Sequence, residues 1–180
     1  MQITKDKRLG GNSSKWKNYQ SELLLTTCNN CDDRHGKIVS VNDWLAELTV
    51  KLHLRCCCSL VNMRTKAAGT ATNMGKNGID YSLFYRKTLP NYYITKWEAK
   101  RNGWDTKLGN LSEACPNKMI GGDIFFNSKE KLPHAQNRVW YEADIDYLEG
   151  YRNTSRILYS NDGLIFVSYD HYQTFFEITE

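Results

Sequence analysis

The spacing of apolar residues changes at Pro116, and this change constrains the fold more than any other feature of the sequence. Before Pro116, apolar residues recur at helical intervals, as Tyr81, Phe84 and Tyr85 do within residues 79–87. After Pro116, apolar residues gather in short runs that turn residues separate, a pattern that predicts strands. The predicted strands are Met119–Phe125, Arg138–Ile145, Arg156–Tyr159, Leu164–Tyr169 and Thr174–Ile178.

Two further helices carry signals at their first residues. Thr95 and Glu98 form a Thr-x-x-Glu capping box, and Gly103 is placed to end that helix in the left-handed conformation. Asn110 and Glu113 repeat the signal for a very short third helix. Helices followed by consecutive antiparallel strands predict an α+β domain, with N-terminal helices packed on one face of a five-stranded antiparallel sheet.

The cysteines divide the chain into two parts. Five of the six lie between Cys28 and Cys58, and only Cys115 follows. Residues 65–78 are rich in Ala, Gly, Thr, Asn and Lys, a composition typical of a linker or a loop. We therefore expect a small, basic Cys/His-rich segment over residues 1–75 and a separate domain over residues 76–180.

The excess of positive over negative charge lies in the first half of the chain. Residues 1–87 contain 14 Lys and Arg against 7 Asp and Glu, whereas residues 88–180 contain 10 against 13. The second half can therefore bind an anionic partner only if its cations converge on one place. The 41% of hydrophobic residues are enough to form a core, and no apolar run is long enough for a membrane span. We expect a folded protein that has no membrane partner.

A series of short motifs after residue 79 matches one known family in order and spacing. The motifs are Leu89-Pro90, Tyr93 to Lys96, Gly103-Trp104, Gly109-Asn110-Leu111, Ile120 to Phe125, Trp140, Glu142 to Ile145, Arg152-Asn153, Arg156 to Ser160 and Asp170 to Phe175. Residues 79–180 thus resemble the barnase and binase ribonucleases. The resemblance implies an endonuclease that cleaves single-stranded RNA through the RNA's own 2′-hydroxyl, by way of a 2′,3′-cyclic phosphate, with no cofactor for catalysis.

Such cleavage requires a base, an acid and cations around a negatively charged phosphorane. By position in the family, Glu142 is the general base, and the alternation of its strand puts it on one face with Asp144. His171, in the turn before the last strand, corresponds to the general acid, and histidine can gain and lose a proton near neutral pH. Outside this family, Glu142 would be read as a solvated glutamate and His171 as an ordinary loop residue.

Three cations complete the predicted catalytic group. Arg152 and Arg156 correspond to the phosphate-binding arginines of the family, and Lys96 opens the second predicted helix. Two guanidinium forks and one ammonium can hold phosphate oxygens and stabilise the phosphorane. Considered alone, each of these cations would be interpreted as a surface residue with a carboxylate neighbour. Asp123 is expected to be a structural hydrogen-bond acceptor near the site.

The predicted substrate-binding residues are Phe125, Asn127, Glu130 and Tyr172, the last of which should stack on or flank the target base. The loop after Phe125 departs from the family, which has Phe-Ser-Asn-Arg-Glu where this chain has Phe-Phe-Asn-Ser-Lys. Either the loop slips by one residue, so that Glu130 accepts hydrogen bonds from guanine, or guanine recognition is weakened because Lys129 can only donate.

The Cys/His-rich segment offers ligands for a structural zinc ion. A Cys-x-x-Cys pair is followed after 21 residues by His-x-x-Cys-x-Cys, which are spacings that zinc sites use. The candidate ligands are Cys28, Cys31, His53, Cys56 and Cys58, with His35 in reserve. Reduced cysteines or a disulfide are the alternatives. With His35-Gly36-Lys37-Ile38, the pattern over residues 24–60 resembles the C-terminal segment of phage minor head proteins of the Mu and SPP1 type, which implies an attachment or delivery role.

The main resemblance also implies partners and a location. The family is accompanied by an acidic inhibitor, barstar, so we expect an RNA substrate, an acidic barstar-like inhibitor bound over Arg152, Arg156 and His171, and a monomeric enzyme. Residues 2–12 are polar and contain no apolar signal core. Cytoplasmic residence, export by a specialised route and a fragment of a longer protein all fit this start.

Our expectation is a toxin or effector that is cytoplasmic before release and is then secreted or delivered without a visible signal peptide. Two other classes of function stay open. One is a catalytically silent nucleic-acid or capsid-binding module, and the other is a zinc or thiol protein with an accessory domain.

Overall fold

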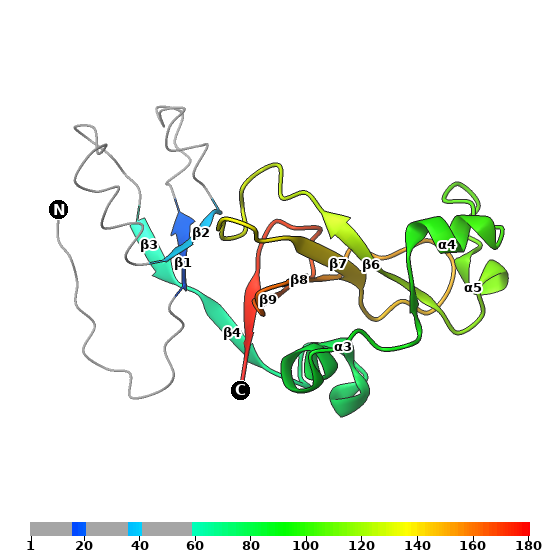
Figure 1. Cartoon of the computed structure of the whole chain (residues 1–180), viewed down its shortest axis with the longest axis horizontal. Coiled ribbons are helices and arrows are strands. Elements are labelled where there is room, and N and C mark those ends of the chain that lie inside the picture. The colour runs from blue at the N-terminus through cyan, green and yellow to red at the C-terminus, as the bar shows by residue number, and fades with distance from the viewer. Residues whose placement is uncertain (1–15, 21–35, 41–58) are drawn as a thin grey trace. The chain divides into compact units, whose positions relative to one another are not determined.

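The chain divides into two compact units between Met63 and Arg64. The computed structural model describes residues 16–20, 36–40 and 59–180. In the first unit, the described residues form an antiparallel sheet in the order β2-β1-β3 (Figure 1). Its strands are β1 (Trp16–Gln20), β2 (Ile38–Ser40) and β3 (Ser59–Asn62).

The second unit is built on a mixed sheet of seven strands, in the order β4-β10-β9-β8-β7-β6-β5 (Figure 1). Strands β6 to β10 pair antiparallel with one another, and β4 and β5 are added in parallel at the two edges. The strands are β4 (Arg64–Ala67), β5 (Tyr93–Ile94), β6 (Met119–Phe125), β7 (Trp140–Asp144), β8 (Arg156–Ser160), β9 (Ile165–Ser168) and β10 (Phe176–Thr179).

This sheet differs at both edges from the five-stranded antiparallel sheet expected from the sequence. Strand β5 has only two residues, which is too short for an alternating pattern to be visible. Strand β4 has the sequence Arg-Thr-Lys-Ala. Its side chains are mostly exposed, so its sequence contains no alternation of apolar and polar residues that would indicate a strand. Since β4 pairs with β10, the second unit begins at Arg64, earlier than the junction expected near residue 75.

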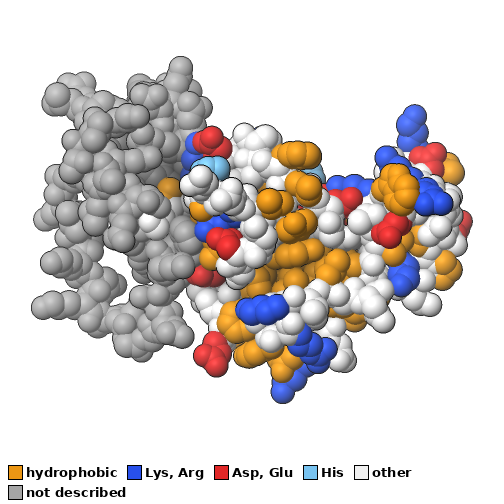
Figure 2. All heavy atoms as spheres, in the orientation of Figure 1, with side chains coloured by type: hydrophobic (Ala, Val, Ile, Leu, Met, Phe, Trp, Pro, Cys, Tyr) orange, Lys and Arg blue, Asp and Glu red, His pale blue; other side chains and the backbone are white. Residues whose placement is uncertain are grey.

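A short helical segment packs on the sheet, where the sequence predicts one. After a 3₁₀ turn, η1 (Gly75–Asn77), helix α3 (Ile79–Tyr81) continues directly as a π-helical turn, η2 (Ser82–Arg86). The wider π-helical turn replaces the second half of the expected α-helix. Ile79 and Leu83 are its buried apolar residues, and they join the core formed by β7, β8 and β9. Figure 2 shows hydrophobic side chains gathered over the strands beside α3.

Two more helices lie together at the far end of β6 (Figure 1). They are α4 (Lys96–Arg101) and α5 (Leu111–Ala114). The predicted capping box begins α4: Glu98 N donates to Thr95 Oγ1 at 3.2 Å, and Thr95 N donates to Glu98 Oε2 at 2.8 Å. Asn110 precedes α5 but does not cap it, because its side chain binds the loop of Gly103 and Asp105 instead. No helix in the described part of the chain has the length and apolarity to cross a membrane.

The register of the sheet gathers polar residues on one face. Glu142 on β7 is paired across the strands with Asp123 on β6. Asp144, two residues along β7, is paired with Arg156 on β8, which in turn is paired with Ser168 on β9. Because cross-strand partners point to the same face, these side chains lie together, and the apolar core with α3 occupies the other face.

Candidate active site

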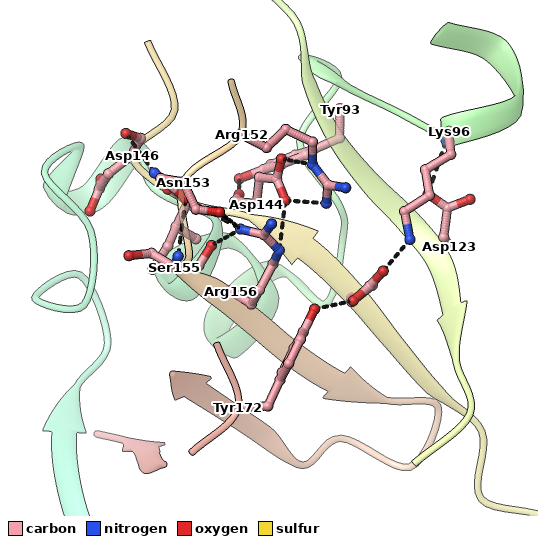
Figure 3. Close-up of polar contacts among 12 residues, drawn as sticks. Tyr93, Lys96, Asp123, Asp144, Asp146, Arg152, Asn153, Ser155, Arg156 and Tyr172 are labelled. Atoms are coloured by element: carbon pink, nitrogen blue, oxygen red, sulfur yellow. Dashed lines mark hydrogen bonds and ion pairs between the residues drawn. The ribbon is translucent and has the colours of Figure 1, made fainter. Parts of the chain in front are cut away.

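Glu142 is almost fully buried, with 7% of its surface exposed, and both of its carboxylate oxygens accept hydrogen bonds. Lys96 Nζ donates to Oε1, and the hydroxyl of Tyr172 donates to Oε2 at 2.5 Å. Figure 3 shows Lys96 and Tyr172 reaching toward the same point from different elements. Strand β7, the start of α4 and the turn before β10 therefore meet at one carboxylate.

The surroundings of Glu142 favour its ionised form. Burial opposes ionisation, but the hydrogen bonds from Lys96 and Tyr172 and the charges of Lys96 and Arg152 outweigh it, so the pKa of Glu142 lies below its ordinary value. Burial and the contact with Glu142 raise the pKa of Tyr172, which keeps its hydroxyl protonated as a donor. An ionised and partly desolvated carboxylate of this kind can accept a proton from a neighbouring hydroxyl.

The position of Lys96 is fixed by the start of α4. Lys96 is the first residue after the N-cap, Thr95, and its backbone N–H donates to Asp123 Oδ2 at 2.9 Å. Asp123 thus satisfies one of the free N–H groups at the helix start and ties α4 to β6. This contact is a structural role for Asp123, and it holds the lysine ammonium over the strand that carries Glu142.

Asp144 is fully buried and holds both arginines that the sequence singles out. Arg152 donates to it twice at 2.6 Å, from Nε to Oδ2 and from Nη2 to Oδ1. Arg156 Nε lies 3.0 Å from Asp144 Oδ1, although without the direction of a good hydrogen bond. Arg156 Nη1 donates at 2.7 Å to the carbonyl groups of Asn153 and Ser155. Both guanidinium groups are therefore fixed beside the site (Figure 3).

His171 is exposed and lies in the turn between β9 and β10. Its φ is 56° and that of Tyr172 is 68°, so two consecutive residues other than glycine adopt the left-handed conformation. The backbone N–H of His171 donates to Thr154 O at 3.1 Å. Its ring centroid lies 4.9 Å from that of Tyr172. The turn thus places the imidazole next to the residue that binds Glu142.

A pocket of about 250 Å³ opens beside this turn. The rings of Phe125 and Tyr172, 5.1 Å apart, form part of its wall. Its other described lining residues are Asn127, Ser128, Lys129, Lys131, His171, Gln173 and Phe175. These described residues include two lysines and no carboxylate, so the charged groups that they present are hydrogen-bond donors only.

The loop after β6 is closed by Asn127. Its side chain donates to Leu132 O at 2.8 Å and accepts from Leu132 N at 3.0 Å, and its carbonyl accepts from Glu130 N at 2.7 Å. Glu130 lines a neighbouring groove, which shares Phe125, Asn127 and Ser128 with this pocket but whose described lining residues do not include Tyr172. Lys129, by contrast, lines the pocket beside Tyr172. Of the substrate-binding residues predicted from the sequence, Phe125, Asn127 and Tyr172 therefore share one pocket, and Glu130 lines the groove next to it.

Two contacts of the site were missed by reasoning from the sequence. The hydroxyl of Tyr172 binds Glu142, whereas the sequence suggested only that its ring faces a base. Asp144 is the shared partner of both arginines, and here a signal was available: an acidic residue predicted on the face of Glu142, within a buried strand, requires a cation as partner.

The predicted zinc ligands, Cys28, Cys31, His53, Cys56 and Cys58, lie outside the described residues. In the described ranges, no three His, Cys, Asp or Glu side chains are grouped so that they could hold a metal ion. The zinc site and the resemblance of residues 24–60 to phage head proteins stay predictions.

Comparison with known proteins concerns the second unit. Residues 79–179 match the family described as ribonuclease. The chain is similar to a ribonuclease of Heyndrickxia coagulans, with 50% identity over 99 residues that cover 55% of this chain and 90% of that protein. It is also 50% identical over 99 residues to ribonucleases of Bacillus intermedius and Bacillus pumilus, where the match covers 60% of each protein. The matched region contains every side chain of the site described above.

Proposed function

Because this chain belongs to the ribonuclease family, of the barnase and binase type, we propose that it is a metal-independent endonuclease that cleaves single-stranded RNA. The cleavage is a transesterification that forms a 2′,3′-cyclic phosphate, and the enzyme then hydrolyses that product. The observation that carries the proposal is the carboxylate of Glu142, which is buried, kept ionised, and accompanied by Lys96 and Arg152. RNA supplies its own nucleophile, so the protein needs to supply only a base, an acid and cations.

In the first step, Glu142 accepts the proton of the 2′-hydroxyl while the 2′-oxygen attacks the adjacent phosphorus. The hydrogen bond that Tyr172 donates to Oε2 leaves the carboxylate oriented, and a substrate hydroxyl can approach the oxygen that Lys96 contacts. Lys96 is then free to turn its ammonium toward the phosphate. Its side chain is the more exposed partner of the pair, at 37% against 9% for Glu142.

Negative charge grows on the phosphorus-bound oxygens as the pentacovalent phosphorane forms. Arg152 and Arg156 are held by Asp144 beside Glu142, so their positive charge is in place before the reaction begins. His171 donates a proton to the 5′-oxygen as the bond from phosphorus to that oxygen breaks. The products of this step are the 2′,3′-cyclic phosphate and a free 5′-hydroxyl.

Hydrolysis uses the same residues with the proton transfers reversed. His171, now neutral, accepts a proton from a water molecule that attacks the cyclic phosphate. Glu142, now protonated, returns its proton to the departing 2′-oxygen. Both residues end in the protonation states from which they began, which a catalytic cycle requires.

The base that this enzyme prefers is set by the pocket beside Tyr172. Of the two explanations that the sequence leaves open, we favour a weakened preference for guanine, because Lys129 and not Glu130 lines the pocket that His171 also lines. An ammonium group cannot accept the hydrogen bonds that the N–H groups of guanine donate. Stacking on Tyr172 and backbone amides near Asn127 would then carry most of the remaining selectivity.

The proposal also covers the setting of the enzyme. We propose a monomeric toxin or effector that leaves its producer, with an acidic barstar-like inhibitor that covers Arg152, Arg156 and His171, and with structural zinc in the first unit. Expression of the active chain, with and without a barstar-type inhibitor, tests the need for protection. High expression of active enzyme alone without harm to the cells would contradict it.

Purified full-length chain, incubated in EDTA with total RNA and separately with single-stranded DNA, tests the reaction class. We expect loss of RNA and no cleavage of DNA, which lacks the 2′-hydroxyl. The variant Glu142→Gln, prepared in the same way, controls for a contaminating nuclease. Activity that disappears in EDTA and returns with added magnesium would contradict a metal-independent mechanism.

A further inference from the structure

The turn that carries His171 is organised around one carboxylate, that of Asp170. Oδ1 accepts three hydrogen bonds, from the hydroxyl of Ser168 at 2.9 Å, from Gln173 N at 3.0 Å and from Thr174 N at 2.9 Å. Oδ2 accepts a fourth, from the hydroxyl of Thr174 at 2.6 Å. Although burial opposes ionisation, these hydrogen bonds hold the pKa of Asp170 below its ordinary value.

The same network reaches the residue that binds Glu142. Ser168, which is fully buried at the end of β9, donates to Asp170 and accepts from Tyr172 N at 2.9 Å. Asp170 therefore binds residues on both sides of His171 and Tyr172: Ser168 before them, and Gln173 and Thr174 after them. Residues other than glycine adopt the left-handed backbone conformation only when their surroundings compensate for its strain, and here two successive residues adopt it. Asp170 and Ser168 supply that compensation.

We propose that Asp170 is a positioning residue for general acid catalysis: its carboxylate holds the turn in the conformation that aims the imidazole of His171 at the leaving 5′-oxygen. Asp170 itself touches neither the substrate nor the transferred proton. The proposal rests on the proposed function, since it requires His171 to be the general acid. It goes beyond that function because it assigns the orientation of the His171 imidazole to a carboxylate that takes no part in the proton transfers.

Substrates with different leaving groups separate this role from a general loss of structure. A dinucleotide releases a 5′-alkoxide that must be protonated, whereas a nucleoside 3′-(4-nitrophenyl phosphate) releases nitrophenolate, which leaves without a proton. Both substrates would carry the nucleoside that the enzyme cleaves fastest. Glu142 is needed for both, because both react through the 2′-hydroxyl, and His171 is needed only for the first.

We expect Asp170→Asn to lower kcat/KM for the dinucleotide by about 10- to 100-fold, the usual effect of misplacing a catalytic group, and to change it for the nitrophenyl substrate by less than about twofold. Thr174→Val, which removes only the bond to Oδ2, should show the same pattern to a smaller degree, and Thr174→Ser should restore the wild-type ratio. Asp162→Asn, in the β8–β9 turn, is the matched control and should leave both rates unchanged.

Equal losses on both substrates in Asp170→Asn, or no loss on either, would overturn the proposal. His171→Ala distinguishes this outcome from failure of the proposed function. If His171→Ala is impaired on the dinucleotide alone, His171 is the general acid and the result for Asp170 stands by itself. If His171→Ala is impaired equally on both substrates, the assignment of His171 is wrong and the role of Asp170 fails with it. Unfolding curves for each variant exclude those that do not fold.

Discussion

Replacing Asp144 by asparagine is the sharpest test of how the site is held together. The side chain is 0% exposed, and its partners Arg152 and Arg156 are 20% and 6% exposed. Asparagine has the same shape and keeps one carbonyl oxygen as an acceptor, but it removes the negative charge between a buried cation, Arg156, and a partly exposed one, Arg152. Removing one partner of a buried ion pair typically costs about 3–5 kcal/mol, because the remaining charge stays desolvated.

We expect the lower end of that range, about 3 kcal/mol of unfolding free energy, because Arg152 is partly exposed and can turn toward water. For a unit of this size, that loss lowers the midpoint of thermal unfolding by roughly 10 °C. Released from Asp144, the two arginines should also lose their alignment, and we expect kcat/KM for RNA to fall by at least about tenfold.

Urea unfolding of the full chain, followed by tryptophan fluorescence, measures the first effect, and RNA cleavage well below the unfolding midpoint measures the second. The control is Asp162→Asn. Asp162 also forms a two-pronged pair with an arginine, Arg138, but its side chain is 45% exposed. Arg138 is only 10% exposed, but because the carboxylate of this pair faces water, we expect the loss of its charge to cost about 1 kcal/mol. Equal unfolding free energies for Asp144→Asn and Asp162→Asn would refute the importance given to burial.

Three further predictions concern the reaction. Glu142→Gln should lower RNA cleavage by at least about 10²-fold, the usual contribution of a general base, while the protein stays folded; wild-type rates would remove Glu142 from its role. Because Lys96 and Tyr172 lower the pKa of Glu142, Lys96→Met and Tyr172→Phe should each raise that pKa and move the acidic limb of the kcat/KM profile to higher pH; a limb that stays in place would contradict the contacts described. In side-by-side cleavage of GpA, ApA, UpA and CpA, Lys129→Glu should increase the preference for GpA by about 1–3 kcal/mol, and Glu130→Ala should leave the wild-type preference unchanged; a strong GpA preference that vanishes in Glu130→Ala would instead support the slipped loop.

The central strands were predictable because they are short apolar runs bounded by turn residues, as expected of strands that are buried on both faces. Strand β6 spans Met119–Phe125 as its apolar run indicates, and β7 and β8 lie within one or two residues of their predicted ends. The capping box was predictable for another reason, since it depends only on residues three apart. The edge strands and the π-helical turn were not, because backbone pairing with a distant segment leaves no mark on an exposed sequence such as that of β4.

The residues of the site were visible in the sequence, but the bonds that connect them depend on the register of the sheet. Alternation along β7 shows that Glu142 and Asp144 share a face, yet only the pairing with β8 brings Arg156 opposite Asp144. A shift of one residue in that pairing would turn every side chain of β8 to the other face and separate the arginine from its partner.

The acidic character of residues 88–180 follows from the same arrangement. Each predicted catalytic cation in this region is bound to a buried carboxylate: Lys96 to Glu142, and both arginines to Asp144. These carboxylates offset the cations in the net charge of the region, so the composition does not reveal the catalytic group. The same carboxylates orient the cations before a phosphate arrives, which is what stabilisation of a transition state requires. Net charge is therefore a poor guide to this kind of site, because the acidic residues that lower it are those that hold the cations in place.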